Sequence, residues 1–218
     1  MTALHFTDLQ RAGTEVVSAQ KMLVPEDLRP GDVMLHEPGV QRWYEKGIAI
    51  ATGSRFTHAS IYIGDQMIAE ARAPRVRVCK IARPMRRERQ LCILRQSTPL
   101  RNGQILALRA FVQAALQRET RFDYAFPFVF YGNRLVRRVL PAVQQTMPRS
   151  PLPPANRPKY FCTSFVVDAF RAMGLIDQSE ARPYRLGSHS AADLLADDKF
   201  GKVVGFLQTT TMNIGGTE

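Results

Sequence analysis

Alternating apolar and polar positions mark two neighbouring strands in the first half of the chain. Residues 57–63 read Thr-His-Ala-Ser-Ile-Tyr-Ile, and residues 66–72 read Gln-Met-Ile-Ala-Glu-Ala-Arg. Alternation with β-branched residues is typical of half-buried strands. The short connection through Gly64 and Asp65 predicts that the two strands form a hairpin.

Other stretches repeat with the period of a strand or of a helix. Alternation predicts further strands at residues 33–35, 76–81 and 90–95. Apolar residues three or four apart predict helices over residues 104–118 and 161–173, and Ser190 with Asp193 has the spacing of a capping box that opens a shorter helix. Strands followed by helices favour an α+β fold with a central antiparallel sheet packed against helices.

The length of 218 residues favours one main domain, which we place over residues 28–207. Residues 1–27 are expected to form an N-terminal arm or peripheral helix, and residues 208–218 a flexible polar tail. The proline-rich residues 141–158 predict an irregular surface connection within the domain.

Neither an export signal nor an apolar run of about 20 residues, the length that spans a bilayer as a helix, is visible in the sequence. We therefore expect a protein that is cytoplasmic or delivered by a specialised secretion system.

The charge of the chain is strongly basic. Its 30 Lys and Arg residues against 19 Asp and Glu give a formal net charge of +11. Such an excess favours acidic partners, namely nucleic acid, lipid headgroups or a polyanionic envelope, although it is also compatible with solubility alone. Three cysteines are too few for a disulfide framework, and none of them has metal-ligand spacing.

The hairpin places two chemically complementary residues on one face. If residues 63–65 form a three-residue loop, His58 lies directly opposite Glu70, with the two Cβ atoms ~5 Å apart. That distance suits a carboxylate that holds one nitrogen of an imidazole ring. A two-residue loop would instead shift the pairing by one and place Glu70 opposite Ala59.

Cys162 stands at the start of the helix predicted over residues 161–173. Free backbone N–H groups and the positive end of the helix dipole stabilise a thiolate at such a position. A cysteine at a helix start, a histidine on a strand and a carboxylate on the next strand are the three parts of a thiol acyl-transfer site. The alternative is an ordinary packed cysteine, because cysteine is among the most often buried residue types.

Several segments together resemble one known family. Residues 28–35 (LRPGDVML), 52–64 (TGSRFTHASIYIG) and 68–71 (IAEA) form an opening block, and residues 121–124 (RFDY), 160–170 (YFCTSFVVDAF) and 190–195 (SAADLL) a closing block. Their order, with the histidine strand before the cysteine helix, resembles the circularly permuted NlpC/P60 family of papain-like proteins, of the YiiX/YaeF type.

The resemblance implies a permuted papain-like fold with Cys162 as nucleophile, His58 as base and Glu70 as the residue that orients His58. An oxyanion donor is expected from Tyr124, and neither a metal nor a cofactor is implied. In the family a Ser-Glu pair usually follows the cysteine, whereas this chain has Thr163 and Ser164.

The implied activity is a cysteine hydrolase or acyltransferase of the amidase, peptidase or phospholipase type. Its expected substrate is an anionic bacterial envelope component, either an acyl lipid or a peptidoglycan peptide. A role as an antibacterial effector would add an immunity protein and a delivery protein as partners. A non-catalytic module that binds anionic lipid or polymer is the alternative, followed by a nucleic-acid binder, for which no motif is present.

We expect the basic side chains to form an anion-binding surface with peripheral membrane contact. The candidates are Arg72, Arg75, Arg77, Arg83, Arg86, Arg87, Arg134, Arg137 and Arg138. The remaining histidines near this region, His36 and His189, are expected to be surface or capping residues.

Overall fold

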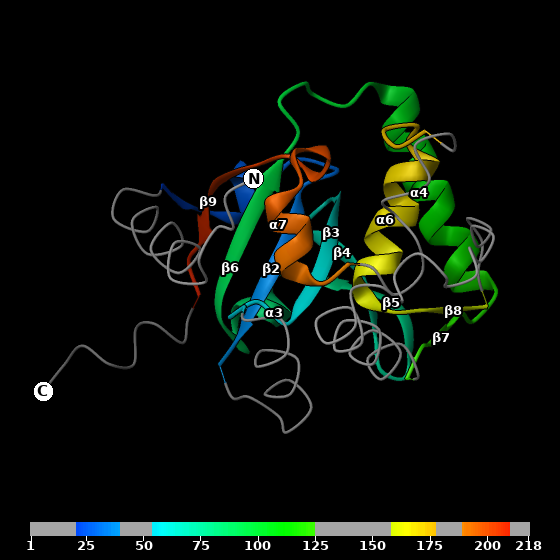
Figure 1. Ribbon diagram of the computed structural model, residues 1–218, viewed down its shortest axis with the longest axis horizontal. Coiled ribbons are helices and arrows are strands. Elements are labelled where there is room, and N and C mark those ends of the chain that lie inside the picture. The colour runs from blue at the N-terminus through cyan, green and yellow to red at the C-terminus, as the bar shows by residue number, and fades with distance from the viewer. Residues whose placement is uncertain (1–20, 40–53, 125–157, 178–188, 210–218) are drawn as a thin grey trace, which may run out of the picture.

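The computed structural model describes residues 21–39, 54–124, 158–177 and 189–209 (Figure 1). Arg134, Arg137 and Arg138 lie outside the described residues, as do nearly all of the proline-rich connection and most of the predicted arm and tail.

A nine-stranded sheet forms the centre of the described structure. Its order is β1-β9-β6-β2-β3-β4-β5-β7-β8, and the neighbours are antiparallel except for the short outer pairs β1–β9 and β7–β8. The strands are β1 (Met22–Leu23), β2 (Val33–Pro38), β3 (His58–Gly64), β4 (Met67–Arg72), β5 (Arg75–Lys80), β6 (Glu88–Arg95), β7 (Arg121–Phe122), β8 (Lys159–Tyr160) and β9 (Lys202–Leu207).

Two long helices lie side by side against one face of this sheet (Figure 1). They are α4 (Asn102–Gln117) and α6 (Cys162–Ala172), and α6 packs on β3 and β4. The shorter helical segments are η2 (Pro25–Asp27), α3 (Ala82–Met85), α7 (Ala191–Ala196) and η4 (Asp198–Phe200).

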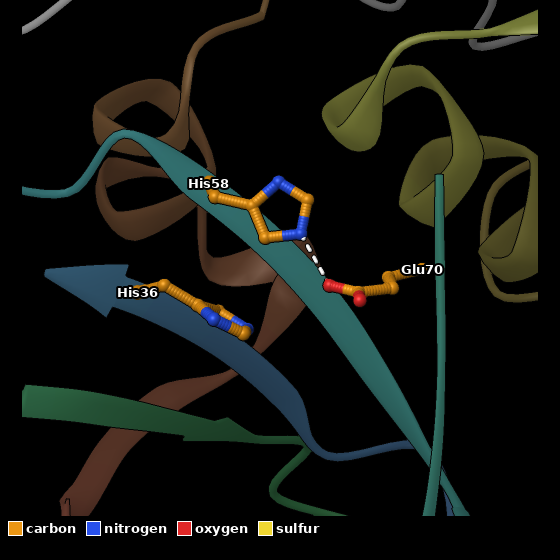
Figure 2. Close-up of side chains that lie close together, drawn as sticks. All are labelled: His36, His58 and Glu70. Carbon is orange, nitrogen blue, oxygen red and sulfur yellow. Dashed lines mark hydrogen bonds and ion pairs between the residues drawn. The ribbon is translucent and has the colours of Figure 1, made fainter. Parts of the chain in front are cut away.

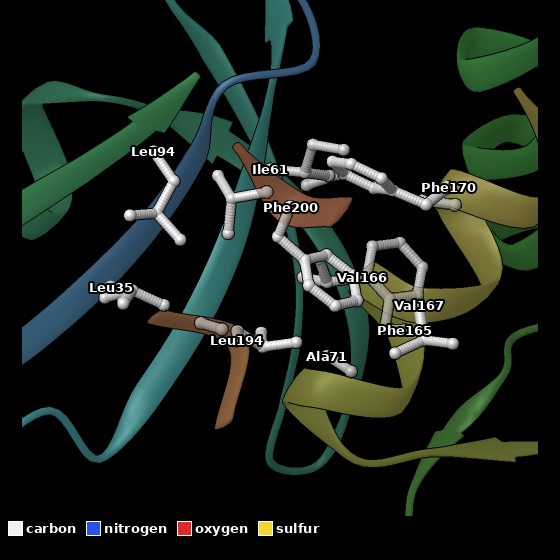
Figure 3. Close-up of a cluster of buried hydrophobic side chains, with 14 of the residues drawn as sticks. Leu35, Ile61, Ala71, Leu94, Phe165, Val166, Val167, Phe170, Leu194 and Phe200 are labelled. Atoms are coloured by element: carbon white, nitrogen blue, oxygen red, sulfur yellow. The ribbon is translucent and has the colours of Figure 1, made fainter. Parts of the chain in front are cut away.

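The sheet separates two hydrophobic clusters. The larger one joins alternate strand residues such as Ile61 and Ala71 to the apolar faces of α4, α6 and α7, with Phe165 and Phe170 of α6 at its centre (Figure 3). The smaller one lies on the other face, where Met34, Tyr62, Leu91 and Ile93 are buried together with their neighbours. Strands buried on both faces explain why the polar side chains of this second face are also shielded from water.

The mixed architecture confirms the α+β prediction, and the hairpin and the helices α4, α6 and α7 form where the sequence predicted them. Ser190 caps α7 by accepting a hydrogen bond from the Asp193 N–H. The sequence did not predict β1, β7, β8 or β9. The end of the predicted arm supplies β1, which pairs with β9. Among the described residues no helix is long and apolar enough to cross a membrane.

Candidate functional site

The hairpin register differs from the predicted one, yet it keeps His58 and Glu70 on the same face. Asp65 and Gln66 form a two-residue turn, and both have positive φ, at 54° and 57°. A β-bulge follows between Tyr62 and Gly64, after which Tyr62 pairs with Ile68. The turn and the bulge together move the pairing by two residues. The predicted direct opposition of His58 and Glu70 is therefore wrong, but their shared face is preserved.

His58 reaches Glu70 diagonally across the two strands. The distance from His58 Nε2 to Glu70 Oε2 is 2.7 Å, and both side chains are buried. Diagonal neighbours on a sheet lie within reach of such long side chains. Figure 2 shows the other ring nitrogen, Nδ1, directed away from Glu70. The carboxylate thus holds one nitrogen and leaves the second for chemistry.

Glu70 is ionised and has two arginines beside it. Arg77 lies on β5 directly opposite Glu70, and its guanidinium donates to Oε1 at 2.8 Å and 2.6 Å. Arg72 lies 4.0 Å from Oε2. Burial on its own raises the pKa of Glu70, but the hydrogen bond from His58 and the neighbouring positive charges outweigh it and hold this pKa well below its usual range.

His58 is neutral in this environment. Burial lowers the pKa of His58 to about 4, against the opposing influence of its hydrogen bond with Glu70. Arg72 adds to the lowering because it places a like charge near the ring. A neutral imidazole bonded through Nε2–H to a carboxylate presents a lone pair at Nδ1, which is the form that a general base requires.

His36 belongs to the same buried cluster, so the expectation of a surface or capping residue is wrong. It lies on β2 directly opposite His58, and the two rings meet edge to face with centroids 4.8 Å apart. Its side chain is fully buried, and its Nε2 lies 2.7 Å from the Ser60 hydroxyl oxygen. Its Nδ1 faces Glu88 Oε1 at 3.7 Å, which is too long for a hydrogen bond. His36 therefore packs against the flank of His58 and restricts its ring.

Glu88 links this cluster to Arg72. The Arg72 guanidinium donates to Glu88 Oε1 at 2.9 Å. Burial raises the pKa of Glu88, but His36 and Arg72 outweigh this and lower it to about 2. The cluster therefore holds two ionised carboxylates, at Glu70 and Glu88, with Arg72 between them.

Cys162 is the first residue of α6, as predicted, and only 1% of its surface is exposed. Its sulfur is near two backbone N–H groups, those of Ala59 and Thr163, whose hydrogen bonds lower the pKa of the thiol. Burial is the larger effect and raises that pKa to about 12. In the described conformation Cys162 is a protonated thiol.

The Ala59 N–H is available to the sulfur because the ladder between β3 and β4 stops short of it. Pairing ends at Ile61 with Ala69, although continuation of the register would place Ala59 opposite Ala71. The start of α6 fits against this opening between the two strands. The His58 side chain extends across the same opening to Glu70. Cys162 and the His58–Glu70 pair therefore border one gap in the sheet.

The residues after Cys162 fix the start of the helix with hydroxyl groups. Ser164 Oγ accepts from the Phe161 N–H at 3.0 Å and donates to the Phe161 carbonyl at 2.9 Å. Thr163 Oγ1 donates to the His189 carbonyl at 2.7 Å, so it ties α6 to the segment before α7. Thr163 and Ser164, which replace the Ser-Glu pair of the resembled family, therefore serve as anchors.

Tyr124 does not contact the thiol among the described residues. It is 60% exposed, and its ring meets Phe122 edge to face at 5.2 Å. Phe122 in turn packs on Phe161, the residue before Cys162, at 5.6 Å. The Cys162 N–H, by contrast, donates to no acceptor within the described part of the chain and is the oxyanion donor that the geometry favours.

The basic candidates divide into buried and exposed side chains. Arg72 and Arg77 are engaged with Glu70 and Glu88, so their assignment to an anion-binding surface is wrong. The exposed ones among the described residues are Arg75, Arg83, Arg86 and Arg87.

His36, His58 and Glu70 also present potential metal-ligand atoms within 4.8 Å of one another. The positive charges of Arg72 and Arg77 beside Glu70 oppose a cation there, and Ser60 already engages His36 Nε2. We therefore interpret the group as a hydrogen-bonded acid–base cluster.

Comparisons with known proteins add nothing to this interpretation, which rests on the geometry of the site. A scan against protein-family models found no match, and a search of curated proteins found none either.

Sequence reasoning missed His36, Ser60 and Glu88. The alternation in residues 33–36 carries a signal for His36, because Met34 and His36 share a face while Val33 and Leu35 occupy the other. Glu88 had no such signal, since it depends on β6 lying beside β2.

Proposed function

We propose that the chain is a papain-like cysteine hydrolase or acyltransferase with a circularly permuted NlpC/P60-type fold. It would cleave an amide or ester bond through a thioester on Cys162. The observation that carries the proposal is the pair His58–Glu70, bonded at 2.7 Å, beside the Cys162 thiol. The sulfur of this thiol accepts the N–H of Ala59, the residue that follows His58. The chain order, with the histidine strand before the cysteine helix, supports the permuted form.

Attack and proton transfer are coupled in this mechanism. The resting pair is a thiol and a neutral imidazole, so His58 Nδ1 takes the thiol proton as the sulfur bonds to the carbonyl carbon. Glu70 stays ionised and stabilises the imidazolium that forms. The Ala59 and Thr163 N–H groups lower the cost of the developing thiolate.

The Cys162 N–H holds the oxyanion of the tetrahedral intermediate. His58 then gives its proton to the leaving amine or alcohol, and the carbonyl reforms as a thioester. Water, deprotonated by His58, releases the acyl group and regenerates the thiol. An acceptor alcohol or amine in place of water makes the same site an acyltransferase.

The proposed substrate is an anionic component of a bacterial envelope, either an acyl phospholipid or a peptidoglycan peptide. The net charge of +11 supports a polyanionic target. Action on an envelope would suit an antibacterial effector, with an immunity protein and a delivery protein as its partners.

The test is incubation of the full chain with purified sacculi and with phospholipid vesicles, with products identified by mass spectrometry. Cys162→Ala is expected to abolish product formation from whichever substrate is cleaved. Cys92→Ala is the matched control, because Cys92 is also buried but lies on β6 in the core. Cleavage by Cys162→Ala at the wild-type rate would refute the mechanism.

A second candidate is a non-catalytic papain-like module that binds anionic lipid or polymer. The deep burial of Cys162 and its raised thiol pKa favour this alternative, since reactive cysteines are usually partly exposed. Alkylation by iodoacetamide separates the two candidates. A catalytic pair predicts that His58→Ala slows alkylation of Cys162, whereas the binding module predicts equal rates in both proteins.

A further inference from the structure

Three basic side chains follow one another across the outer strands of the sheet. Arg75 on β5 pairs directly with Arg121 on β7, and Arg121 pairs with Lys159 on β8. All three are exposed, and no ion pair or side-chain hydrogen bond to any of them forms among the described residues. We call Arg75, Arg121 and Lys159 the basic row.

The basic row lies on the same face of the sheet as His58 and Glu70. Residues that pair directly across neighbouring strands point to the same side. Arg75 pairs with Arg72, which shares its face with Glu70 two residues earlier. The row therefore continues the face of the candidate active site outward to β8, the last strand of the described sheet.

Like charges directly opposite one another destabilise a sheet. Here three of them succeed each other at the strand spacing of about 5 Å, with no acidic side chain in the register between them. A ligand with several negative charges would remove this repulsion. The row is thus better suited to a surface of phosphates than to a single carboxylate.

An exposed aromatic ring lies on the other side of β7 from the row, because Phe122 follows Arg121 and pairs with the buried Tyr160. Tyr124 follows β7 by two residues and is 60% exposed, while its ring rests on Phe122. Phe122 in turn contacts Phe161, which is the residue before Cys162. Tyr124 therefore belongs to the surface around the start of α6 and not to the row.

We propose that the basic row docks the protein on anionic phospholipid bilayers, and that it presents a phospholipid acyl ester to Cys162. The choice of lipid over peptidoglycan rests on the proposed hydrolase function. The docking itself does not, because it concerns a surface that lies outside the catalytic groups.

The test uses flotation of the full chain with vesicles, in a Cys162→Ala background so that no lipid is consumed. Vesicles that contain phosphatidylglycerol are compared with vesicles of phosphatidylcholine alone, at physiological salt. Each basic residue near a membrane contributes about 1 kcal/mol, which is about fivefold in affinity. The triple variant R75Q/R121Q/K159Q is therefore expected to bind phosphatidylglycerol vesicles about 100-fold more weakly.

The matched control is R29Q/R101Q/K202Q, which removes the same charge from exposed positions. Arg101 and Arg121 lie beyond opposite ends of α4, a separation of about 24 Å along the helix. This distance exceeds the screening length of about 8 Å, so the control should lose less than about fivefold. Thermal unfolding checks the fold, and removal of the repulsion should leave the row variant at least as stable as wild type.

Three results would overturn the docking proposal. They are equal losses in the row variant and the control, unchanged vesicle binding in the row variant, and weakened binding of duplex DNA with vesicle binding intact. A row that only prevents pairing of the edge strand would give the second result together with aggregation. Failure of the hydrolase mechanism would instead appear as turnover by Cys162→Ala, with docking unaffected.

Discussion

Glu70 is the side chain on which the buried polar groups converge. Its Oε2 bonds to His58 and its Oε1 to Arg77. Cys79 Sγ lies 3.9 Å from the same Oε1. Burying such a carboxylate costs desolvation free energy. Removing its charge would in turn leave its buried positive partner without compensation, which destabilises the folded state. Its charge therefore matters to stability as well as to the orientation of His58.

Glu70→Gln keeps the shape of the side chain but leaves Arg77 without its counter-ion, whereas Arg72 retains Glu88. Breaking a buried ion pair from one side costs about 3 kcal/mol of the free energy of unfolding, which urea denaturation measures. Glu37→Gln is the control, because Glu37 has only long contacts, of 3.6 Å and 3.8 Å, to exposed arginines. Its cost should stay below about 1 kcal/mol. Equal costs would contradict the convergence on Glu70.

The lowered pKa of His58 predicts a loss of stability in mild acid. The unfolded chain binds a proton at His58 near pH 6.5, but the folded protein does so only near pH 4. Between these values the unfolded state holds more protons, so a fall in pH favours unfolding, by about 3 kcal/mol in total. This contribution is fully present above pH 6.5.

His58→Gln should remove this part of the pH dependence. The measurement is the free energy of unfolding of both proteins at several pH values from 7 to 4.5. The lowered pKa of the half-buried His189 acts in the same window in both proteins, so only their difference reports on His58. Glu70 and Glu88 stay ionised in the folded protein over this range, and the protons that they take up in the unfolded chain near pH 4.5 enter both curves and cancel in the difference. Parallel curves would show that His58 titrates normally.

At the scale of elements, the start of α6 decides where the thiol lies. Ser164 holds both backbone groups of Phe161, which fixes the entry of the chain into the helix just before Cys162. Ser190 stabilises the start of α7 from the N-cap position, where it accepts from the Asp193 N–H, whereas Ser164 stands in the first turn of α6. The helix α6 positions Cys162, whereas α7 carries none of the candidate catalytic residues.

Ser164→Ala and Ser190→Ala are each expected to lower the free energy of unfolding by about 1 kcal/mol, the usual cost of a lost cap. Only Ser164→Ala should also lower turnover, because it releases the backbone that aims Cys162. Paired measurements of unfolding and of kcat test this difference. A similar loss of kcat in Ser190→Ala would assign the effect to general loosening.

The elements that sequence reasoning predicted are those defined by local pattern. Hydrophobic period alone places β3, β4, α4 and α6, and with them His58, Glu70 and Cys162. The short strands β1, β7 and β8 have two residues each and exist only through pairing with distant segments. No periodicity can be recognised over two residues.

β9 was missed for a different reason. Gly205 interrupts its apolar run and reads as a break in the pattern. In the structure a Cβ at Gly205 would lie 2.2 Å from the Lys21 carbonyl oxygen, so the close approach of the chain before β1 requires glycine there. Such a requirement is visible only once the partner strand is in place.

At the scale of the whole molecule, the arginines of β5 serve two separate purposes. Arg77 faces Glu70 and is 23% exposed, whereas Arg75 faces the outer strands and is exposed. The net charge of +11 thus combines an internal set that sustains the fold with an external set that is free to meet a partner.

The two arginines should therefore respond differently to the same substitution. Arg77→Gln is expected to cost about 2 kcal/mol in unfolding free energy, since it removes charge-assisted hydrogen bonds to a buried carboxylate. Arg75→Gln should leave stability unchanged or slightly raised, because it relieves repulsion with Arg121. Thermal unfolding of the two variants measures the difference, and the reverse order would contradict the register between β5 and β7.

The turn at Asp65–Gln66 and the bulge beside it have a consequence for how this hairpin can change in length. A single inserted residue that the bulge does not absorb would exchange the two sides of β4, so that Ala69 and Ala71 would meet His58 and Glu70 would face the apolar side of α6. Two inserted residues restore the original sides. Insertions and deletions in this hairpin are therefore tolerated in even steps, and a library of loop lengths should alternate between folded and unfolded members.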